Sequence, residues 1–423
     1  MDEKKSLSWT NKGKKDLFET FAVELQEYYE SDKMPGSCDR EMQYWLELQN
    51  ERLQGKDLSM KYHFVPRDIP DNMKREPILS YADDKYKTKA FCRPCRFEGK
   101  FYRGTKQIYS YKEKRNLFQS ITFRKNPEVG ENEEYICPNC GAGTTIKGLL
   151  DGCDYCQTRF KMDELFPKVT GFYMLKDFTG SKKDLAWEIL RNVLPTILVC
   201  FLISAYFECF VNGNGLFPGA LIALLQGSII GLVIGYLLWC VYKVGSVLVT
   251  GAESADMLVG ASGSKQKFEK QMKKYSPEFS YAFFTNKVIS MLRVLLYAKD
   301  VKEIPFYAGE SVGDLFEDIA DAHFRGSMGL KKFEVKDNYC YVTVDAYMDV
   351  IYAKTGIRKK EVTYRMELRK DISVPMDMNF SIARIHCPNC NTSFDATRRC
   401  DCPACGTRYE VTDDWVVLSV KKK

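Results

Sequence analysis

The chain has no strong excess of charge of either sign. Its 423 residues carry a formal net charge of +6, so composition alone does not point to nucleic acid as a partner. The start, Met1-Asp-Glu-Lys-Lys5, contains no apolar segment, so we expect no secretory signal. Because 45% of the residues are hydrophobic and 28% are charged, the composition predicts two or three folded domains and excludes a wholly disordered chain.

The cysteines form two sets of paired Cys-x2-Cys motifs, separated by twelve residues in the first set and eleven in the second. Each spacing is typical of four thiolates on one tetrahedral Zn²⁺. Such a site has no open position, so it should be structural and contribute on the order of 10 kcal/mol to folding. Disulfides would need an oxidising compartment, and a redox pair would need a βαβ context that the sequence lacks. The predicted zinc ligands are Cys137, Cys140, Cys153 and Cys156, and Cys387, Cys390, Cys402 and Cys405.

A shorter motif, Cys92-Arg-Pro-Cys95, has no second pair of its own. One hypothesis is a third metal site in which Cys92 and Cys95 are joined by Cys38 or His63. Another is that they share a metal with the pair that begins at Cys137. The third alternative is that they bind no metal, and a zinc stoichiometry of two would favour it.

Two apolar runs predict a transmembrane hairpin over 189–243. Glu208 is the one charged residue from 193 to 210, and 216–241 contains none, so each run can cross a bilayer. Basic residues flank the hairpin and are missing from its loop, so the positive-inside rule predicts both termini in the cytoplasm, with the protein in the cell membrane. These flanking residues are Lys182, Lys183, Arg191 and Lys243.

The second run has a small residue at every fourth position, a pattern that lets another helix approach to backbone contact. This seam could pack within the hairpin, or it could join copies of the chain into a homo-oligomer. It consists of Gly219, Ala223, Gly227, Gly231 and Gly235.

A basic segment follows the hairpin. Phe268, Met272 and Tyr275 are spaced for one helical face, and lysines surround them. The segment could lie on anionic lipid, or it could be the ordinary first helix of the next domain. The candidate lipid-facing residues are Lys265, Lys267, Lys270, Lys273 and Lys274.

Residues 265–386 predict an α+β domain. Ser276-Pro277 signals the start of a helix that runs to about residue 298, and Ser311 opens a second helix that ends before Gly326. Alternating apolar residues then predict long antiparallel strands at 340–350 and 361–369. One face of this sheet should pack on the helices.

The basic segment, the Ser276-Pro-Glu-Phe-Ser280 helix start and the two strands together resemble the domain of mitochondrial inner-membrane translocase subunit 44, which has a nuclear-transport-factor-2-like fold. The layout is also similar to bacterial membrane proteins that join such a domain to a zinc ribbon. The resemblance implies a domain at the membrane with a concave pocket for a lipid or protein partner, and it supplies no catalytic residues. The hairpin and the terminal zinc ribbon depart from the mitochondrial protein, so a role in protein import is in doubt.

Two further segments lie in the amino-terminal third. Apolar residues at helical spacing over 14–54 predict a pair of helices. Basic and aromatic residues then alternate from 92 to 123, a pattern that can bind single-stranded nucleic acid or can form a β-rich domain with an aromatic core.

The sequence as a whole predicts a multidomain protein. We expect a membrane-anchored, non-enzymatic scaffold with two zinc ions that binds a protein or lipid partner at the cytoplasmic membrane face. The alternative is a membrane-tethered protein that binds nucleic acid. An enzyme that uses Asp345, Asp349 and His323 is a third hypothesis, although their spacing forms no recognisable motif. The predicted parts are a helical region (1–80), a cysteine-rich basic region (81–170) with a zinc ribbon (137–156), the hairpin (189–243), the α+β domain (265–386) and a second zinc ribbon (387–423).

Overall fold

The computed structural model divides the chain into two compact units. Asp177–Val259 forms the smaller unit, and Met1–Lys176 together with Gly260–Lys423 forms the larger one. The structure describes residues 16–67, 77, 79–82, 86–124, 132, 134–137, 140–151, 153–155, 167–176, 182–275, 277, 279–373, 384–387, 389–390, 392–395, 399–408 and 415–423.

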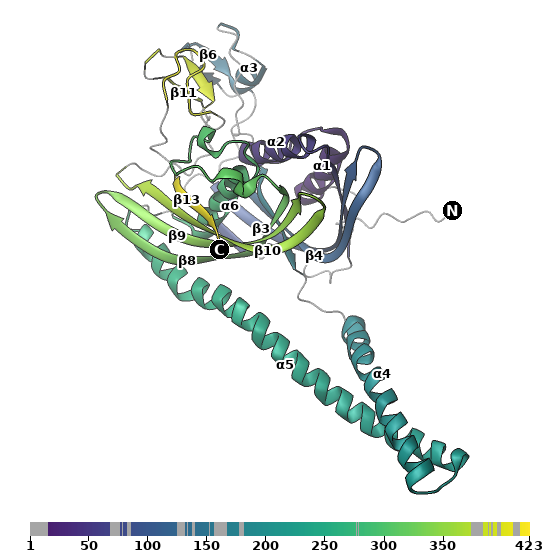
Figure 1. Ribbon diagram of the computed structural model, residues 1–423. Coiled ribbons are helices and arrows are strands. Elements are labelled where there is room, and N and C mark those ends of the chain that lie inside the picture. Colours follow the sequence, from purple (N-terminus) through teal and green to yellow (C-terminus); the bar gives the residue numbers. More distant parts are fainter. Residues whose placement is uncertain are drawn as a thin grey trace. The chain divides into compact units, whose positions relative to one another are not determined.

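Two long helices account for the smaller unit. Helix α4 (Lys182–Tyr206) ends in one turn of π-helix, η2 (Phe207–Val211), and α5 (Leu216–Met272) starts after a short loop (Figure 1). Ile189–Val211 and Leu216–Val241 are each long and apolar enough to cross a membrane. Their outward side chains are exposed leucine, isoleucine, valine and phenylalanine, which suit a lipid environment.

The small-residue seam of α5 packs against α4. A Cβ added to Gly227 would lie 2.6 Å from the Cα of Phe201, and one added to Gly235 would lie 3.1 Å from the Cα of Val193. At Gly231 an added Cβ would overlap the backbone of Ile197. Ala223 is fully buried. The seam therefore packs closely within the hairpin, as one of the two alternatives predicted.

Two helices open the described part of the larger unit, as the sequence predicted. Helix α1 (Leu17–Ser31) is capped by Asp16 and α2 (Arg40–Gln54) by Asp39, whose carboxylates accept hydrogen bonds from the Glu19 and Met42 amides. Their buried faces include Phe18, Phe21, Leu25 and Trp45.

The first sheet is antiparallel and has five strands. Its order is β1 (Ser59–Pro66), β3 (Tyr86–Arg103), β4 (Lys106–Arg124) and β7 (Lys168–Lys176), with β2 (Leu79–Ala82) paired to β3. Between β4 and β7 the chain forms a small module of β5 (Glu134–Ile136), β6 (Gly143–Thr145) and α3 (Ile146–Asp151).

The second sheet has four antiparallel strands in the order β13 (Val416–Lys422), β10 (Ile357–Asp371), β9 (Tyr339–Ala353) and β8 (Ile319–Lys336). Helix α6 (Tyr281–Tyr297) and the 3₁₀ turns η3 (Val301–Glu303) and η4 (Gly313–Phe316) precede it. A second small module contains β11 (Arg384–His386) and β12 (Ser393–Asp395). The predicted strands at 340–350 and 361–369 are confirmed, with Val342, Val344, Val362 and Tyr364 buried on one face.

The predicted second helix of this region is wrong. The segment that begins at Ser311 forms only the turn η4 and then the first half of β8. All residues from Ile319 to Phe324 are buried, on both faces of the strand, so apolar residues do not alternate there. Leu315, Ile319 and Ala322 are spaced like residues on one face of a helix, and this spacing led to the wrong prediction.

The start of α6 also differs from the prediction. Ser280, whose hydroxyl accepts a hydrogen bond from the Phe283 amide, is the N-cap. The predicted cap, Ser276, lies outside the described residues.

The larger compact unit joins segments from both sides of the hairpin. Helix α2 packs against α6 (Figure 1), and the buried aromatic residues of both halves of the larger unit belong to one hydrophobic core. Trp45 of α2 stacks on Tyr297 of α6 with ring centroids 6.3 Å apart. The amino-terminal segment and the α+β segment thus fold together, although the hairpin separates them in the sequence.

Candidate functional sites

The carboxy-terminal cysteine set converges on one point. Sγ atoms of Cys387 and Cys405 are 3.5 Å apart, as are those of Cys390 and Cys402, and all four lie within 4.8 Å of one another. Thiolates at the corners of a tetrahedral zinc site are separated by about 3.8 Å, because each Zn–S bond is about 2.3 Å long. This set therefore has the size that a metal ion needs.

The amino-terminal set converges in the same way. Cys140 and Cys153 Sγ atoms are 3.8 Å apart, and Cys137 joins them within 4.8 Å. Cys156, the predicted fourth ligand, lies outside the described residues. Both sets could hold a metal ion.

Both modules build their knuckles with the same backbone bonds. The Cys137 amide donates to the Ala142 carbonyl at 2.8 Å, and the Cys402 amide donates to the Thr407 carbonyl at 3.0 Å. Gly141 and Gly406 close the turns with φ of +74° and +71°, a conformation that glycine adopts without strain. The fold thus explains why a glycine follows Cys140 in the first set and Cys405 in the second.

Local hydrogen bonds favour the thiolate form of two ligands. The hydroxyl and amide of Thr407 lower the pKa of Cys405 to about 6, and the Cys390 amide lowers the pKa of Cys387. Burial raises the pKa of Cys402 to about 11, because a charged sulfur there would lose solvation. A bound cation would remove that penalty and keep all four sulfurs ionised.

Cys92 and Cys95 do not share metal-ligand geometry in the described part of the chain. They lie three residues apart on the extended strand β3, so their side chains point to opposite faces and their Cα atoms are about 10 Å apart. Burial raises the pKa of Cys95 to about 12, which disfavours its thiolate. Within the described part of the chain, neither residue belongs to a group with metal-ligand geometry.

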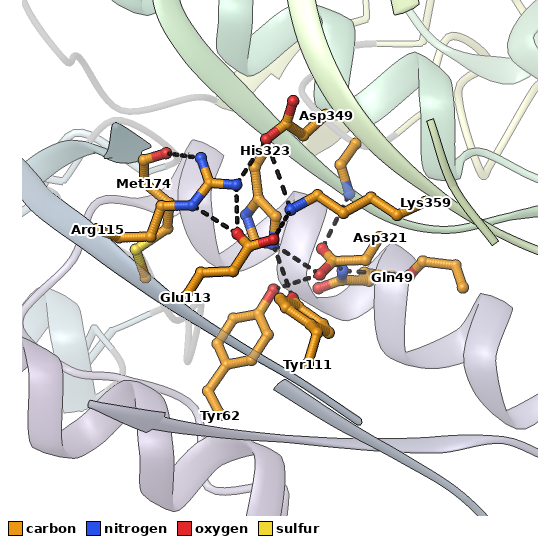
Figure 2. Close-up of polar contacts among 12 residues, drawn as sticks. Gln49, Tyr62, Tyr111, Glu113, Arg115, Met174, Asp321, His323, Asp349 and Lys359 are labelled. Atoms are coloured by element: carbon orange, nitrogen blue, oxygen red, sulfur yellow. Dashed lines mark hydrogen bonds and ion pairs between the residues drawn. The ribbon is translucent and has the colours of Figure 1, made fainter. Parts of the chain in front are cut away.

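A network of charged and polar side chains is buried between the two sheets (Figure 2). At its centre is Asp321 on β8, whose carboxylate accepts hydrogen bonds from Tyr62 at 2.8 Å and Gln49 at 2.9 Å. The Nε2 atom of His323 is 2.9 Å from the same carboxylate, and Tyr111 is 3.3 Å from His323. Burial alone would raise the pKa of Asp321, but its contacts with His323, Tyr62 and the Ala322 amide outweigh burial and hold the pKa below its usual value.

The second half of this network links β4 to β9 and β10. Arg115 donates to Asp349 at 2.8 Å and to Glu113 at 2.7 Å, and Lys359 donates to Glu113 at 2.5 Å (Figure 2). Asp349 is only 1% exposed. Its burial favours the neutral acid, yet the Arg115 hydrogen bond and charge keep its pKa below the usual range.

The three residues of the enzyme hypothesis do not form one site. His323 and Asp349 belong to the buried network, whereas Asp345 lies farther along β9, where Arg365 contacts it at 2.7 and 2.9 Å. Asp321, His323, Arg115 and Asp349 are buried and paired, whereas Glu113 and Lys359 pair with each other and are partly exposed. A 230 Å³ cavity is lined by Leu58, Arg103, Ile108 and residues 353–357, none of which belongs to the network. The geometry therefore fits a role in holding the two sheets together.

The basic and aromatic stretch from 92 to 123 is part of the first sheet. Phe97, Phe101 and Tyr111 are buried in the core, and Phe118 packs on Tyr173. Stacking on bases needs exposed ring faces, which these aromatics do not offer. The interpretation as a β-rich region with an aromatic core is confirmed.

The carboxy-terminal end of α5, which follows the hairpin, packs in the protein core. Phe268 and Met272 are each 1% exposed, and the Phe268 ring packs on Phe279, Phe284 and Phe333. Phe268 and Met272 are therefore buried in protein and do not face lipid, whereas Tyr275, the third residue of the predicted apolar face, is 47% exposed. Lys270, Lys273 and Lys274 are exposed, while the side chains of Lys265 and Lys267 lie outside the described residues.

Comparison with protein-family models, with curated proteins and with solved structures finds no match. The resemblance to translocase subunit 44 therefore gains no support from relatives.

Proposed function

We propose that this protein is a membrane-anchored, non-enzymatic scaffold whose two cysteine modules bind structural zinc. The observation that carries the proposal is the close-packed hairpin. Its glycine seam meets the backbone of α4, while its remaining surface is apolar and exposed. A pair of helices with an apolar outer surface is stable in lipid and would aggregate in water.

The positions of the hairpin aromatics support the same proposal. Tyr206, Phe207 and Phe210 cluster at the loop end, and Tyr236 lies beside Trp239 at the other end with ring centroids 5.7 Å apart. Phe217 and Trp239 are separated by about 33 Å of helix, close to the thickness of a bilayer core. Aromatic side chains are enriched at both membrane surfaces.

The non-enzymatic part of the proposal is supported by the buried network. Its acids and bases pair with one another between the sheets, so a substrate would have to displace those pairs to reach them. Zinc is proposed over other metals because a set of four thiolates is typical of structural zinc.

Alkaline extraction of membranes from cells that express the full chain tests the anchor. We expect the chain to stay in the pellet, as an integral protein does, and zinc analysis of the purified protein to give two ions per chain. Release into the alkaline supernatant would contradict the anchor, and a chain without metal would contradict the structural zinc.

A further inference from the structure

Toward the hairpin between β8 and β9, one face of the second sheet lies outside the hydrophobic core. In β9, Val342, Val344 and Ala346 point into the core, so Tyr341, Thr343 and Asp345 point to the opposite side. Arg369 is paired with Tyr341 and Arg365 with Asp345, so they share this face. Toward the hairpin between β8 and β9, Tyr339, Tyr341, Thr343 and Tyr347 are all partly exposed. We call this region the basic sheet face.

Basic residues outnumber acidic ones on this face. The strand register and the ion pairs place seven basic and four acidic side chains on this face. The basic residues are Lys331, Lys332, Lys336, Arg365, Arg369, Lys421 and Lys423, and the acidic residues are Glu334, Asp345, Glu367 and Asp371.

Three of the basic groups converge on one buried acid. Arg365 contacts the Asp345 carboxylate at 2.7 Å, Lys423 at 3.4 Å and Lys331 at 4.0 Å. Asp345 is only 1% exposed, while the Lys423 side chain is 56% exposed. One negative charge inside the sheet therefore holds three positive groups in place, and the excess positive charge faces outward.

The aromatic residues of this face are all tyrosines. The Arg369 guanidinium lies over the Tyr339 ring at 4.9 Å, so one side of that ring is already covered. Tyr339 and Tyr341 contact each other with ring centroids 6.4 Å apart. Tyrosine between lysines and arginines suits the head-group region of a membrane, where an apolar ring and a polar hydroxyl are both accommodated.

We propose that the basic sheet face docks on an anionic phospholipid bilayer. The proposal rests on the membrane anchor proposed above, and it names the partner that this surface binds. Charge complementarity is the first argument, since each lysine or arginine near an anionic surface adds about 1 kcal/mol. The second argument is the tether, because residues 242–267 of α5 connect this unit to the second span in one chain. Single-stranded nucleic acid is less suitable, because stacking needs open ring faces and Arg369 already covers one side of the Tyr339 ring.

The test uses the full chain in nanodiscs of neutral phosphatidylcholine, so that the face is free to bind added vesicles. Binding is measured by flotation with vesicles that contain about 30% phosphatidylserine, and with neutral vesicles, at about 0.15 M salt. We expect binding to the anionic vesicles at least about tenfold above the neutral ones. Equal binding to both would overturn the proposal.

Charge reversal locates the surface. The triple variant Lys332→Glu/Lys336→Glu/Lys421→Glu changes three exposed side chains of the face and should weaken anionic binding by about 100-fold. The matched control Lys61→Glu/Arg358→Glu/Lys360→Glu makes the same change in net charge at exposed positions off the face, and should stay within about twofold of the unmodified chain. Equal losses in both variants would contradict the location.

Two further measurements separate the possible failures. Unchanged zinc content and melting temperature of the triple variant show that it is folded, so its loss of binding then reports on the surface. A labelled oligonucleotide that binds the face, while anionic vesicles do not, would assign it to nucleic acid and overturn the proposal. A chain that resists alkaline extraction but does not bind anionic vesicles would leave the scaffold proposal standing and refute only this inference.

Discussion

Single buried acidic residues form hydrogen bonds and ion pairs that connect the two sheets. Asp349 pairs with Arg115 of β4, and Asp321 accepts bonds from Tyr62 of β1 and Gln49 of α2, so each carboxylate joins segments that are more than two hundred residues apart in the chain. Removing one partner of such a pair leaves the other charge buried and unmatched. The network therefore stabilises one arrangement of the two halves.

The first prediction is that Asp349→Asn destabilises the larger unit by about 3–5 kcal/mol, because Arg115 and Lys359 lose the acid that they share. The measurement is thermal unfolding of the purified full chain. Asp337→Asn is the matched control, because Asp337 is 80% exposed in a turn with φ of +51°, which asparagine also tolerates. A similar effect in both variants would contradict the prediction.

Acid sensitivity is the second prediction. The pKa of Asp349 is lower in the folded chain than in the unfolded chain, so its stabilisation is fully present above the unfolded pKa of about 4 and is lost as pH falls through the folded value. We expect the melting temperature to fall on acidification below about pH 5, and Asp349→Asn to reduce this pH dependence. If the slope of melting temperature against pH is the same in Asp349→Asn, other groups cause the acid sensitivity and the prediction is contradicted.

At the scale of single elements, α5 changes its environment along its length. Its first part packs on α4 through glycines, and its last turn places Phe268 and Met272 in an aromatic core. The sequence predicted a separate basic helix after a linker, whereas residues 242–272 continue one helix. The apolar spacing of Phe268 and Met272 was recognised, but spacing alone cannot tell a lipid from a protein surface.

The third prediction concerns this last turn. Phe268→Ala should cost about 3–5 kcal/mol of unfolding free energy, the usual cost of removing a buried aromatic ring. Lys274→Ala, two turns away on the exposed side, should cost less than about 0.5 kcal/mol. Chemical denaturation of both variants is the measurement, and a tolerant Phe268→Ala would favour the lipid-facing interpretation.

The fourth prediction concerns the hairpin. Gly231→Leu should separate α4 from α5, because even a Cβ at this position overlaps the Ile197 backbone. Gln226→Leu on the exposed side of the same helix is the control. With single cysteines placed on the two helices, disulfide crosslinking within one chain should fall in Gly231→Leu and persist in Gln226→Leu. Crosslinks between chains that depend on Gly231 would instead favour the homo-oligomer.

For the whole molecule, local patterns predicted elements well and their assembly poorly. The strands at 340–350, the helical pair and both cysteine sets follow from spacing, because neighbours in sequence determine them. The segments before and after the hairpin fold together through contacts such as the one between Trp45 and Tyr297. The spacing of apolar residues in the sequence does not reveal such contacts. Asp321 was equally hidden, since the first half of β8 is buried on both faces and has no alternation.

The central claim is a chain anchored in the membrane with both metal modules on the cytoplasmic side. The most direct measurement is labelling of intact cells with a membrane-impermeant thiol reagent, with the labelled cysteines identified by peptide mass spectrometry. Asn212→Cys in the hairpin loop is the positive control and should be labelled from outside. We predict that Cys137, Cys140, Cys387 and Cys390 are labelled only after the cells are opened and the metal is chelated. Labelling of either set in intact cells would contradict the account.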